Sequence, residues 1–339
     1  MIITLKKGTS ESQVESLKEL LRSKNIEPRV WKGELETVIG CVGDIAHLDP
    51  GLIEALDVVE HVQRIQEPYK AANRKFHPAD SVIDCGGVKI GGGSFAVIAG
   101  PCSVESEAQI VEVARAVKAA GATLLRGGAF KPRTSPYAFQ GLGAEGLRLL
   151  SLAKKETGLP IVTELMEFKD IELFNDVDVI QIGARNMQNF NLLKEVGAHT
   201  QKPVLLKRGM SATLQELLMS AEYIMASGNP NVILCERGIR TFETALRNTL
   251  DLGVVTYLHR LSHLPVVVDP SHATGHAYMV DSVAVAATAI GADGLIIEVH
   301  NDPPHAKCDG AQSQTPAMFD STMRGIARIR SVVSPCQTP

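Results

Sequence analysis

The feature that most constrains the fold is a series of eight short apolar runs that recur from residue 95 onward, separated by helix-like patterns. Each run is continuous rather than alternating, which is typical of strands that are buried on both faces of a parallel sheet. The expected strands cover residues 95–99, 123–126, 161–164, 179–182, 204–207, 232–235, 266–269 and 294–297. Eight parallel strands, each followed by a helix, close into a (β/α)8 TIM barrel, so we predict this α/β fold.

The segments between the runs carry the start and stop signals of helices. Residues 105–120 form a helical pattern that follows Ser103 and stops at Gly121, and residues 279–290 form one that stops at Gly291. An open, doubly wound sheet is the alternative arrangement of such units. It is disfavoured because the glycines at 91–93 precede a strand, whereas the glycines of a dinucleotide-binding turn follow one.

The first 65 residues have a pattern of their own. Strand-like runs at 2–5, 27–31, 35–42 and 58–64 combine with helical patterns at 11–23 and 47–56 in the order β-α-β-β-α-β. This order predicts a small ferredoxin-like α+β domain. The segment holds no nucleophile beside a base and no cluster of ligands, so a regulatory role is favoured over a catalytic one. A stabilising cap is the alternative.

These patterns predict the domain order of the chain. Residues 1–65 form the ferredoxin-like regulatory domain, and the polar stretch 66–80 is its linker. Residues 81–330 form the catalytic barrel, in which an initial hairpin at 81–93 caps the floor, and residues 331–339 are a C-terminal tail.

Composition and charge exclude several classes of protein. The formal net charge of -4 provides no general attraction to nucleic acid or to an anionic membrane. No apolar run approaches the length of a membrane span, and the N-terminus lacks the pattern of a secretory signal, so we expect a cytoplasmic protein. The six cysteines show no CxxC spacing, which favours reduced thiols over a disulfide framework.

Four residues with metal-binding side chains stand at or beyond the ends of the predicted strands: Cys102, His272, Glu298 and Asp309. The carboxyl ends of barrel strands meet at one mouth, so the four should converge. Singly, each has an ordinary explanation, such as a buried cysteine or a strand-end ion pair, but their joint position favours one metal site. A thiolate, an imidazole and two carboxylates suit one divalent ion, Mn²⁺, Fe²⁺, Co²⁺ or Zn²⁺. A fifth coordination position would remain for a substrate carbonyl.

Cationic side chains follow the strand ends in the same way. The six are Arg126, Lys131, Arg133, Arg185, Lys207 and Arg237. Any one alone would be ordinary surface charge, but six at one mouth of an acidic protein repel one another unless strongly anionic groups bind there. Guanidinium groups bind phosphate and carboxylate oxygens in pairs. The mouth is therefore predicted to take two phosphates, or a phosphate and a carboxylate.

These segments resemble those of a known family over essentially the whole chain. The sequences GPCSVE from Gly100, KPRTS from Lys131, GARN from Gly183, CERG from Cys235, DPSH from Asp269 and DGAQS from Asp309 carry the resemblance. They are similar to the signature segments of the 3-deoxy-D-arabino-heptulosonate 7-phosphate (DAHP) synthases, in the type I beta form with a ferredoxin-like N-terminal domain.

The resemblance implies the condensation of phosphoenolpyruvate with D-erythrose 4-phosphate, the first step of the shikimate pathway. It implies that Cys102, His272, Glu298 and Asp309 are the metal ligands. It implies contacts with phosphoenolpyruvate from Arg126, Lys131, Arg185, Lys207 and Arg237, and contacts with the aldose phosphate from Arg133, Thr134 and Ser135. Ala184 is expected to bind substrate as well. On this basis Lys131 is expected to deliver a proton to the new alkoxide, and Glu164 and Asp269 to handle the water.

The resemblance also implies regulation and assembly. Tyrosine or phenylalanine is expected to bind at the N-terminal domain and to inhibit the barrel. Because such domains usually pair across subunits, we expect a homotetramer.

Two other functions compete with this interpretation. The first is 3-deoxy-D-manno-octulosonate 8-phosphate synthase, which performs the same chemistry on arabinose 5-phosphate. The segment KPRTS at 131–135 argues against it, because that family resembles Lys-Ala-Asn-Arg-Ser there. The second is a non-catalytic sensor of phosphorylated metabolites, against which the intact ligand and arginine sets argue.

Two positions depart from the pattern of the resembled family. Gln314 stands where an apolar residue is expected, and Cys308 stands where a serine is more usual. Neither change removes a ligand. Cys308 adds a second thiol beside Asp309, so we hypothesise that oxidation pairs it with Cys102 and expels the ion.

Overall fold

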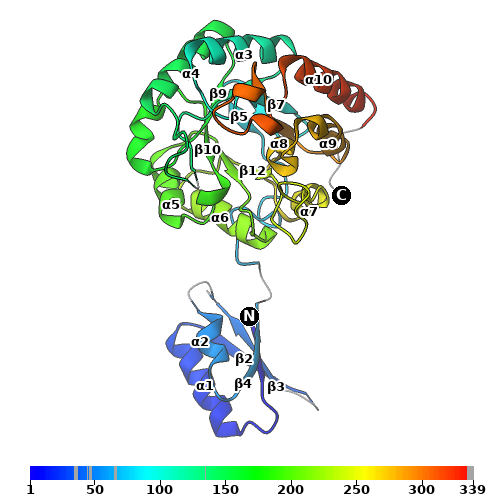
Figure 1. Ribbon diagram of the computed structural model, residues 1–339. Helices are drawn as coiled ribbons and strands as arrows, with labels where there is room; N and C mark the ends of the chain where they lie inside the picture. Colours follow the sequence, from blue (N-terminus) through cyan, green and yellow to red (C-terminus); the bar gives the residue numbers. More distant parts are fainter. Residues whose placement is uncertain (34–36, 44, 46–47, 65–66, 134, 334–339) are drawn as a thin grey trace. The chain divides into compact units, whose positions relative to one another are not determined.

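The structure is a computed structural model that describes residues 1–33, 37–43, 45, 48–64, 67–133 and 135–333 (Figure 1). The chain divides into two compact units, Met1–Lys70 and Ala71–Pro339. Each unit has its own architecture.

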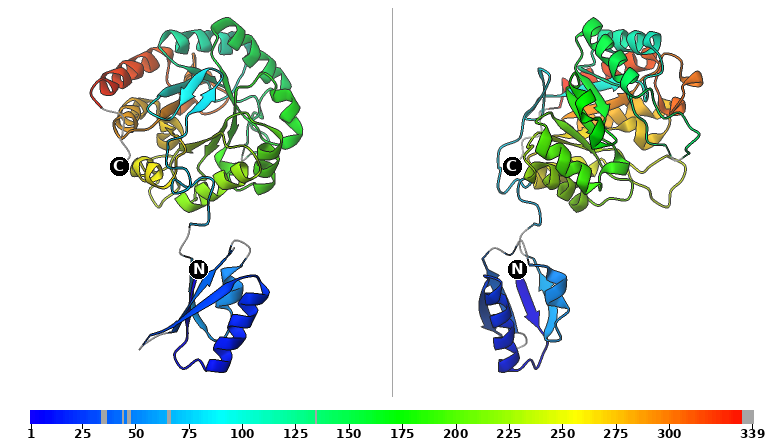
Figure 2. Two further views of the ribbon diagram at one scale, coloured as in Figure 1. Left: turned by 180° about the vertical axis from the view of Figure 1, so that it is seen from behind. Right: turned by 90° about the vertical axis from the view of Figure 1, so that its left-hand side faces the viewer.

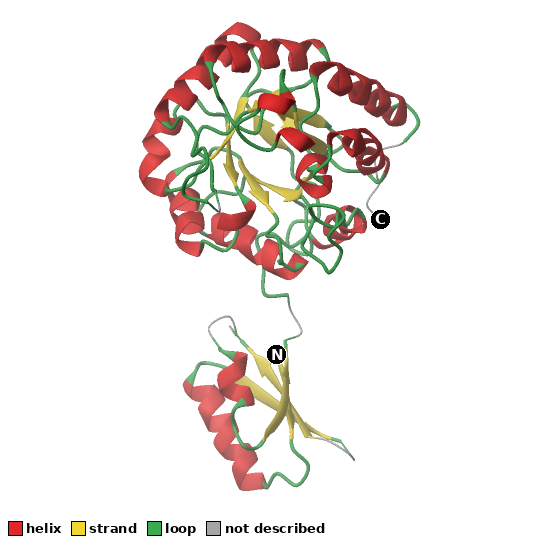
Figure 3. Ribbon diagram, viewed as in Figure 1, coloured by secondary structure: helices red, strands yellow, loops and turns green. Residues whose placement is uncertain are grey.

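The first unit is a four-stranded antiparallel sheet with two helices (Figure 3). Its elements are β1 (Ile2–Leu5), α1 (Glu11–Ser23), β2 (Glu27–Lys32), β3 (Thr37–Val42), α2 (Pro50–Glu54) and β4 (Val59–Gln63). The strand order β2-β3-β1-β4 is that of the predicted ferredoxin-like motif, which is confirmed. The second helix was expected over 47–56, of which residue 47 lies outside the described residues. It begins after Asp49, whose side chain caps it by accepting from the N–H of Gly51.

A single apolar core holds this first unit together. Val14, Leu17 and Leu21 share one face of α1, since residues three and four apart lie on the same side of a helix. They pack against Ile3 and Ile39 from one face of the sheet. The helix therefore forms where the apolar spacing of the sequence predicts it.

The second unit is a closed barrel of eight parallel strands, which confirms the predicted TIM barrel. The strands are β7 (Ala96–Gly100), β8 (Leu124–Arg126), β9 (Ile161–Glu164), β10 (Val179–Ile182), β11 (Val204–Lys207), β12 (Val232–Glu236), β13 (Val266–Val268) and β14 (Gly294–Glu298). Each strand pairs with its neighbours in chain order, and β14 closes the barrel on β7 with Glu298 opposite Gly100. Glu298 is thus the last residue of its strand, at the carboxyl mouth.

A ring of helices surrounds the barrel (Figure 1). The longer ones are α3 (Glu107–Ala119), α4 (Ala144–Thr157), α5 (Phe190–His199), α6 (Leu214–Ala226), α7 (Gly253–Leu261), α9 (Ala277–Ala289) and α10 (Pro316–Arg330). A 3-10 segment, η1 (Phe168–Phe174), follows β9 in place of an α-helix. Helix α3 starts two residues later than the pattern predicts, because Ser106 rather than Ser103 caps it. In the described part of the chain, none of the helices is both long and apolar enough to span a membrane.

Four short elements lie in the loops at the strand ends. They are η2 (Ala184–Asn186), α8 (Pro270–Thr274), η3 (Pro303–His305) and η4 (Gly310–Gln312). Of the predicted site residues, these loops hold Ala184, Arg185, Asp269, His272 and Asp309.

A hairpin closes the amino-terminal end of the barrel. It consists of β5 (Ile83–Cys85) and β6 (Val88–Ile90), and Figure 2 shows it across the barrel in the view from behind. Ile83, Cys85 and Ile90 are buried in one cluster with inward-facing strand residues such as Ile98 and Ile296. The apolar residues of this segment thus serve as the barrel floor.

The second half of the expected linker is attached to the barrel unit. The backbone N–H groups of Ala71 and Ala72 donate to the Glu222 carboxylate at 3.0 and 2.9 Å. Arg74 Nε donates to the His259 carbonyl at 2.6 Å, and its Nη2 donates to Asp80 Oδ1 at 2.6 Å. Residues 71–80 therefore belong to the second unit, which begins at Ala71.

Candidate metal centre and anion cavity

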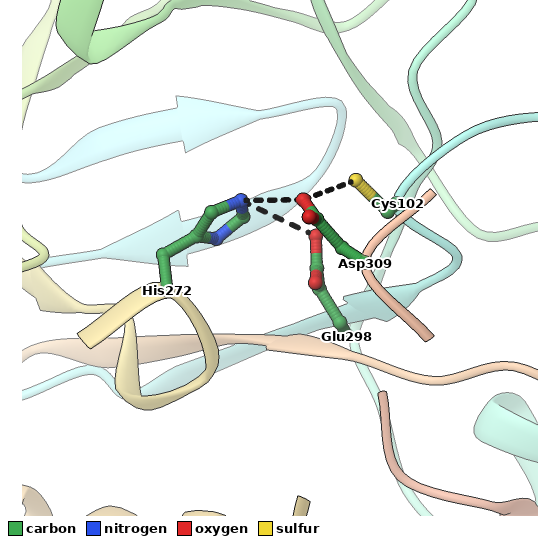
Figure 4. Close-up of side chains that lie close together, drawn as sticks. All are labelled: Cys102, His272, Glu298 and Asp309. Carbon is green, nitrogen blue, oxygen red and sulfur yellow. Dashed lines mark hydrogen bonds and ion pairs between the residues drawn. The ribbon is translucent and has the colours of Figure 1, made fainter. Parts of the chain in front are cut away.

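The four predicted metal ligands converge at the carboxyl mouth of the barrel (Figure 4). Cys102 follows β7, His272 lies in α8 after β13, Glu298 ends β14, and Asp309 immediately precedes η4. Their potential ligand atoms all lie within 4.8 Å of one another. Cys102 Sγ is 3.2 Å from Asp309 Oδ2, and His272 Nε2 is 3.4 Å from Glu298 Oε1 and 3.8 Å from Asp309 Oδ2.

The surroundings of these atoms fit a divalent cation. Glu298 is fully buried, and its Oε1 accepts no hydrogen bond from the residues that the structure describes, although Arg126 Nη2 lies 3.1 Å away. A buried carboxylate oxygen without a hydrogen-bond donor is costly unless another positive group satisfies it. Burial alone would raise the pKa of Asp309, but Arg247 and His272 hold it well below its usual range. Both carboxylates are therefore available as anionic ligands.

Asp269 orients the imidazole of His272. It caps α8 by accepting from the backbone N–H of His272 at 2.9 Å, and its Oδ2 lies 2.7 Å from His272 Nδ1. A proton held on Nδ1 by this carboxylate leaves the Nε2 lone pair directed at the other ligands. Burial lowers the pKa of His272, which favours the neutral form that binds metal. Lys207 Nζ contacts the same Asp269 carboxylate.

Two thiols lie at this centre. Cys308 Sγ donates to Ser103 Oγ at 3.1 Å, and the side chain is only 6% exposed. Its hydrogen bond with Cys102 lowers the pKa of Cys308 to about 7, whereas the same bond and burial raise the pKa of Cys102. A bound cation would reverse the shift at Cys102, because metals favour the thiolate form of a ligand. The five described cysteines are all free.

A cavity of about 380 Å³ opens beside the four ligands. Its lining includes all but one of the residues expected to bind substrate, namely Arg126, Lys131, Arg133, Ser135, Ala184, Arg185, Lys207 and Arg237. Thr134 lies outside the described residues. Glu164, His272, Cys308 and Asp309 also line the cavity, so the structure places the cation set and the ligand set together.

Several cationic groups of this cavity are buried with unused donors. Arg126 and Arg237 are each 4% exposed. Within the described residues, Nε and Nη1 of Arg126 and Nη1 of Arg133 have no hydrogen-bond partner. Burial lowers the pKa of Arg237, because the charged form loses its hydration. Guanidinium groups that keep buried, unused N–H donors are the arrangement expected for a site that binds phosphate or carboxylate.

Lys131 and Glu164 are two titratable groups that line the cavity. Lys131 Nζ lies 3.1 Å from both the carbonyl oxygen and Sγ of Cys102. Glu164, which is 6% exposed, accepts from Gln181 Nε2 at 3.4 Å. A Cβ at Gly183 would lie 2.0 Å from Glu164 Oε1, so only glycine leaves room for this carboxylate. Asp269, the third residue expected to act in proton transfer, is fully buried behind His272.

Several residues of the cavity wall were not predicted from the sequence. Arg240, Arg247, Asn248, Gln181 and Met210 line it as well. Arg240 and Arg247 lie in the loop between β12 and α7, several residues beyond the strand end. A signal was present, because this one loop of an acidic protein carries three arginines, counting Arg237.

The departure at Gln314 has a structural explanation. Its side chain is 1% exposed and exchanges hydrogen bonds with Thr322 Oγ1 of α10 at 2.9 and 3.2 Å. A buried amide with its own partner costs little. The backbone N–H of Gln314 also donates to the Glu298 carbonyl at 2.9 Å, which holds the segment after Asp309 beside β14.

Comparisons with known proteins agree with this arrangement. Residues 66–330 match the DAHP synthetase I family, and residues 1–67 match the DAHP synthase ferredoxin-like domain. The phospho-2-dehydro-3-deoxyheptonate aldolase of Thermotoga maritima is 48% identical over 330 residues, which cover 97% of each chain. A crystal structure of such an aldolase (DAHP synthase) from that organism superposes with a TM-score of 0.93 at 47% identity, again over 97% of each chain.

More distant relatives match a smaller part of the chain. The 2-dehydro-3-deoxyphosphooctonate aldolase of Koribacter versatilis is 32% identical over 270 residues, which cover 73% of this chain and 95% of the relative.

Proposed function

The chain belongs to the DAHP synthetase I family, and on that premise we propose that it condenses phosphoenolpyruvate with D-erythrose 4-phosphate and water to give DAHP and phosphate. The resemblance of its motifs to this family is confirmed, and the chain is an enzyme of the DAHP synthase class, a transferase of aromatic amino acid biosynthesis. The observation that carries the choice of substrates is the cavity of buried cations beside four potential metal ligands.

The charges of the cavity suit two phosphorylated substrates. Arg126, Lys131, Arg185, Lys207 and Arg237 would hold the carboxylate and phosphate of phosphoenolpyruvate, with Ala184 at the same wall. Arg133 and Ser135, together with Thr134, would take the aldose phosphate. The unused donors of Arg126 and Arg133 support this assignment, because they lack partners in the described protein and would find them on the substrates.

The four ligands would hold one divalent ion, Mn²⁺, Fe²⁺, Co²⁺ or Zn²⁺, which would supply Lewis-acid polarisation of the aldose carbonyl. Lys131 would give a proton to the alkoxide that forms when C3 of phosphoenolpyruvate attacks the aldehyde carbon. Glu164 would take a proton from the water that adds at C2, after which phosphate leaves with its bridging oxygen. For Asp269, the contact with His272 supports an orienting role over direct handling of water.

Phosphate release tests the proposed reaction and its competitors. The purified enzyme should release phosphate from phosphoenolpyruvate with erythrose 4-phosphate and a divalent ion, and much more slowly with arabinose 5-phosphate. The reverse preference would favour the octulosonate synthase activity that the 32% identical relatives are named for. No release with either aldose phosphate would favour a non-catalytic sensor.

We further propose that tyrosine or phenylalanine binds the first unit and inhibits the barrel of a homotetramer. The match of residues 1–67 to the DAHP synthase ferredoxin-like domain supports this role. Trp31, the single tryptophan of the chain, is 54% exposed and packs over Gly40, where a Cβ would lie 2.4 Å from the indole ring. An exposed aromatic side chain on a sheet is suited to contact an aromatic ligand or a second domain.

Two measurements test the regulatory proposal. Removal of residues 1–70 should abolish inhibition by the aromatic amino acids while phosphate release continues, because residues 71–80 stay attached to the barrel unit. Trp31 fluorescence should change on titration of the intact enzyme with the inhibitory amino acid. Equal sensitivity of the shortened and full-length enzymes would refute the proposal. Light scattering of the intact enzyme tests the tetramer.

A further inference from the structure

One oxygen of each proposed carboxylate ligand, Glu298 and Asp309, accepts a hydrogen bond from a neighbouring side chain. Gln312 Nε2 donates to Glu298 Oε2 at 2.5 Å, and Arg247 Nη1 donates to Asp309 Oδ1 at 3.0 Å. The same Arg247 Nη1 donates to Gln312 Oε1 at 2.5 Å. The second oxygen of each carboxylate lies toward the other predicted ligands: Glu298 Oε1 is near His272 Nε2, and Asp309 Oδ2 is near His272 Nε2 and Cys102 Sγ.

The chemistry of the partners determines the orientation of the Gln312 amide. A guanidinium only donates hydrogen bonds, and an ionised carboxylate only accepts them. The amide oxygen must therefore face Arg247, and the amide nitrogen must face Glu298. A flipped amide would place an oxygen against a carboxylate oxygen inside a site where Gln312 is 2% exposed. The hydrogen bonds from Arg247 to Gln312 and from Gln312 to Glu298 can therefore form together in only one orientation of the Gln312 amide.

Arg247 is itself held in place by α8, the element that carries His272. The backbone N–H groups of Arg247 and Asn248 donate to the carbonyls of Thr274 and Ala273 at 3.2 and 2.8 Å. Asn248 Nδ2 also donates to the His272 carbonyl at 2.8 Å. One loop therefore ties His272, Glu298 and Asp309 together, although the Arg247 side chain is 37% exposed.

From these contacts we propose that Gln312 and Arg247 are positioning residues that preset which oxygen of Glu298 and of Asp309 faces the metal. The inference rests on the proposed metal site and adds two residues to it. Without Gln312, Glu298 Oε2 would be buried without a donor, and the carboxylate would rotate toward Arg126 or hydration. Loss of such supporting contacts weakens metal binding by about 10- to 100-fold in known metal sites.

Gln312→Met tests the proposal without changing the charge. Metal-free enzyme is titrated with Co²⁺ against a chromophoric chelator, with no substrate present, so that the readout is metal affinity rather than turnover. The dissociation constant of the variant should rise by about tenfold, and the d–d absorption of bound Co²⁺ should shift. A merely structural role would lower the unfolding temperature of the metal-free protein and leave the metal affinity unchanged.

Arg247→Met tests the same positioning role at the more exposed of the two residues, where misfolding is not expected. Removal of a positive charge alone would strengthen cation binding, so a control for the lost charge is needed. Arg240→Met is the matched control, because Arg240 lies in the same loop and, within the described residues, contacts neither Glu298 nor Asp309. The proposal expects Arg247→Met to bind Co²⁺ at least several-fold more weakly than Arg240→Met.

The outcomes separate this inference from the metal site itself. The positioning role is refuted, and the metal site stands, if the wild-type enzyme binds Co²⁺ and neither variant loses affinity. In that case Gln312→Met would bind Co²⁺ as tightly as the wild type, and Arg247→Met as tightly as Arg240→Met. If His272→Ala binds Co²⁺ as tightly as the wild type, the proposed metal site is wrong, and so is the positioning role of Gln312 and Arg247.

Discussion

At the residue scale, a single carboxylate sets the tautomer of His272. Asp269 holds the Nδ1 side of the ring at 2.7 Å, and its own pKa stays well below the usual range because His272 and Lys207 outweigh the effect of burial. The same residue types occur at the opposite end of the barrel, where Asp293 Oδ2 lies 2.9 Å from His259 Nε2. The two pairs allow a matched comparison.

Asp269→Asn should weaken metal affinity by about 10- to 100-fold, because the amide can donate to Nδ1 and so force the proton onto Nε2. The variant also leaves Lys207 buried without its anion, so the unfolding temperature should fall. Chelator competition and thermal unfolding measure the two effects. Asp293→Asn is the control, and a similar loss of metal affinity in that variant would contradict the orienting role of Asp269.

Cys308, where the resemblance leads us to expect a serine, places a second thiol beside Asp309. We predict that hydrogen peroxide oxidises Cys102 and Cys308 to a disulfide in the metal-free enzyme, with release of two water molecules per peroxide. Both side chains are buried, but Cys308 lines the cavity from which peroxide would enter. Metal binding should be lost and should return with dithiothreitol, because the disulfide occupies the ligand thiolate.

A non-reducing peptide map of the oxidised protein checks this prediction directly. Cys308→Ser should keep its metal affinity after the same treatment, whereas Cys41→Ser, in the other unit, should behave as the wild type. If the map shows both thiols free, the redox hypothesis is wrong.

At the element scale, the apolar runs predicted the barrel strands to within one residue at each end, and β9, β10 and β11 have the expected bounds. Continuous burial of the strands makes these runs unambiguous. Helix boundaries were less certain, because a cap depends on which nearby side chain reaches the free N–H groups, as Ser106 does in α3. The polar composition of residues 71–80 predicted a linker, but hydrogen bonds with Glu222 and His259 attach this segment to the barrel unit.

His263, which follows α7, contacts both ends of the segment from Ala71 to Ser81. The attachment of this segment to the barrel unit should therefore depend on pH. The ring is 4% exposed, with Nδ1 at 2.7 Å from Ser81 Oγ and Nε2 at 2.7 Å from the Ala71 carbonyl oxygen. Burial lowers the pKa of His263 in the folded protein. Nearby His77 and Arg74 also lower it, while the hydrogen bond to Ala71 and the charge of Asp80 oppose the shift.

The sign of the effect follows from proton linkage. Below an unfolded pKa of about 6.5, the unfolded chain takes up more protons at His263 than the folded chain does. The stabilising contribution is therefore complete above about pH 6.5 and is lost as the pH falls toward the folded pKa. Urea unfolding of the enzyme at pH 8 and pH 5.5 measures it.

His263→Gln should show a smaller loss of unfolding free energy between these two pH values than the wild type. His305→Gln changes an exposed histidine, with 82% of its side chain accessible, and should retain the full dependence. An unchanged pH dependence in His263→Gln would contradict the assignment.

At the scale of the whole molecule, each of the two units has its own core. Ile3, Leu21 and Ile39 belong to the core of the first unit, while Ile98 and Ile296 belong to that of the barrel. We therefore predict two thermal unfolding transitions, of which a divalent ion shifts only the one that belongs to the barrel. Free ion at 100 times its dissociation constant would add about 2.7 kcal/mol to that unit.

Calorimetry with and without metal measures both transitions. Trp31 fluorescence assigns them, because the only tryptophan lies in the first unit. A metal-induced shift of the transition that Trp31 reports would show that the two units unfold together.

The fold class, the eight strands and most of the side chains at the barrel mouth could be predicted from the amino-acid sequence alone. Strand and helix patterns are local, and parallel strands bring their carboxyl ends together, so Cys102, His272 and Glu298 could be placed near one another without a structure. The contacts between individual atoms of these side chains could not be predicted, because they depend on how the loops pack. Arg247 and Asp309 are separated by 62 residues, and no local pattern connects them. Their contact, like those of Gln312 with Glu298 and of Asp269 with Lys207, exists only after loops from different strands have packed at the mouth.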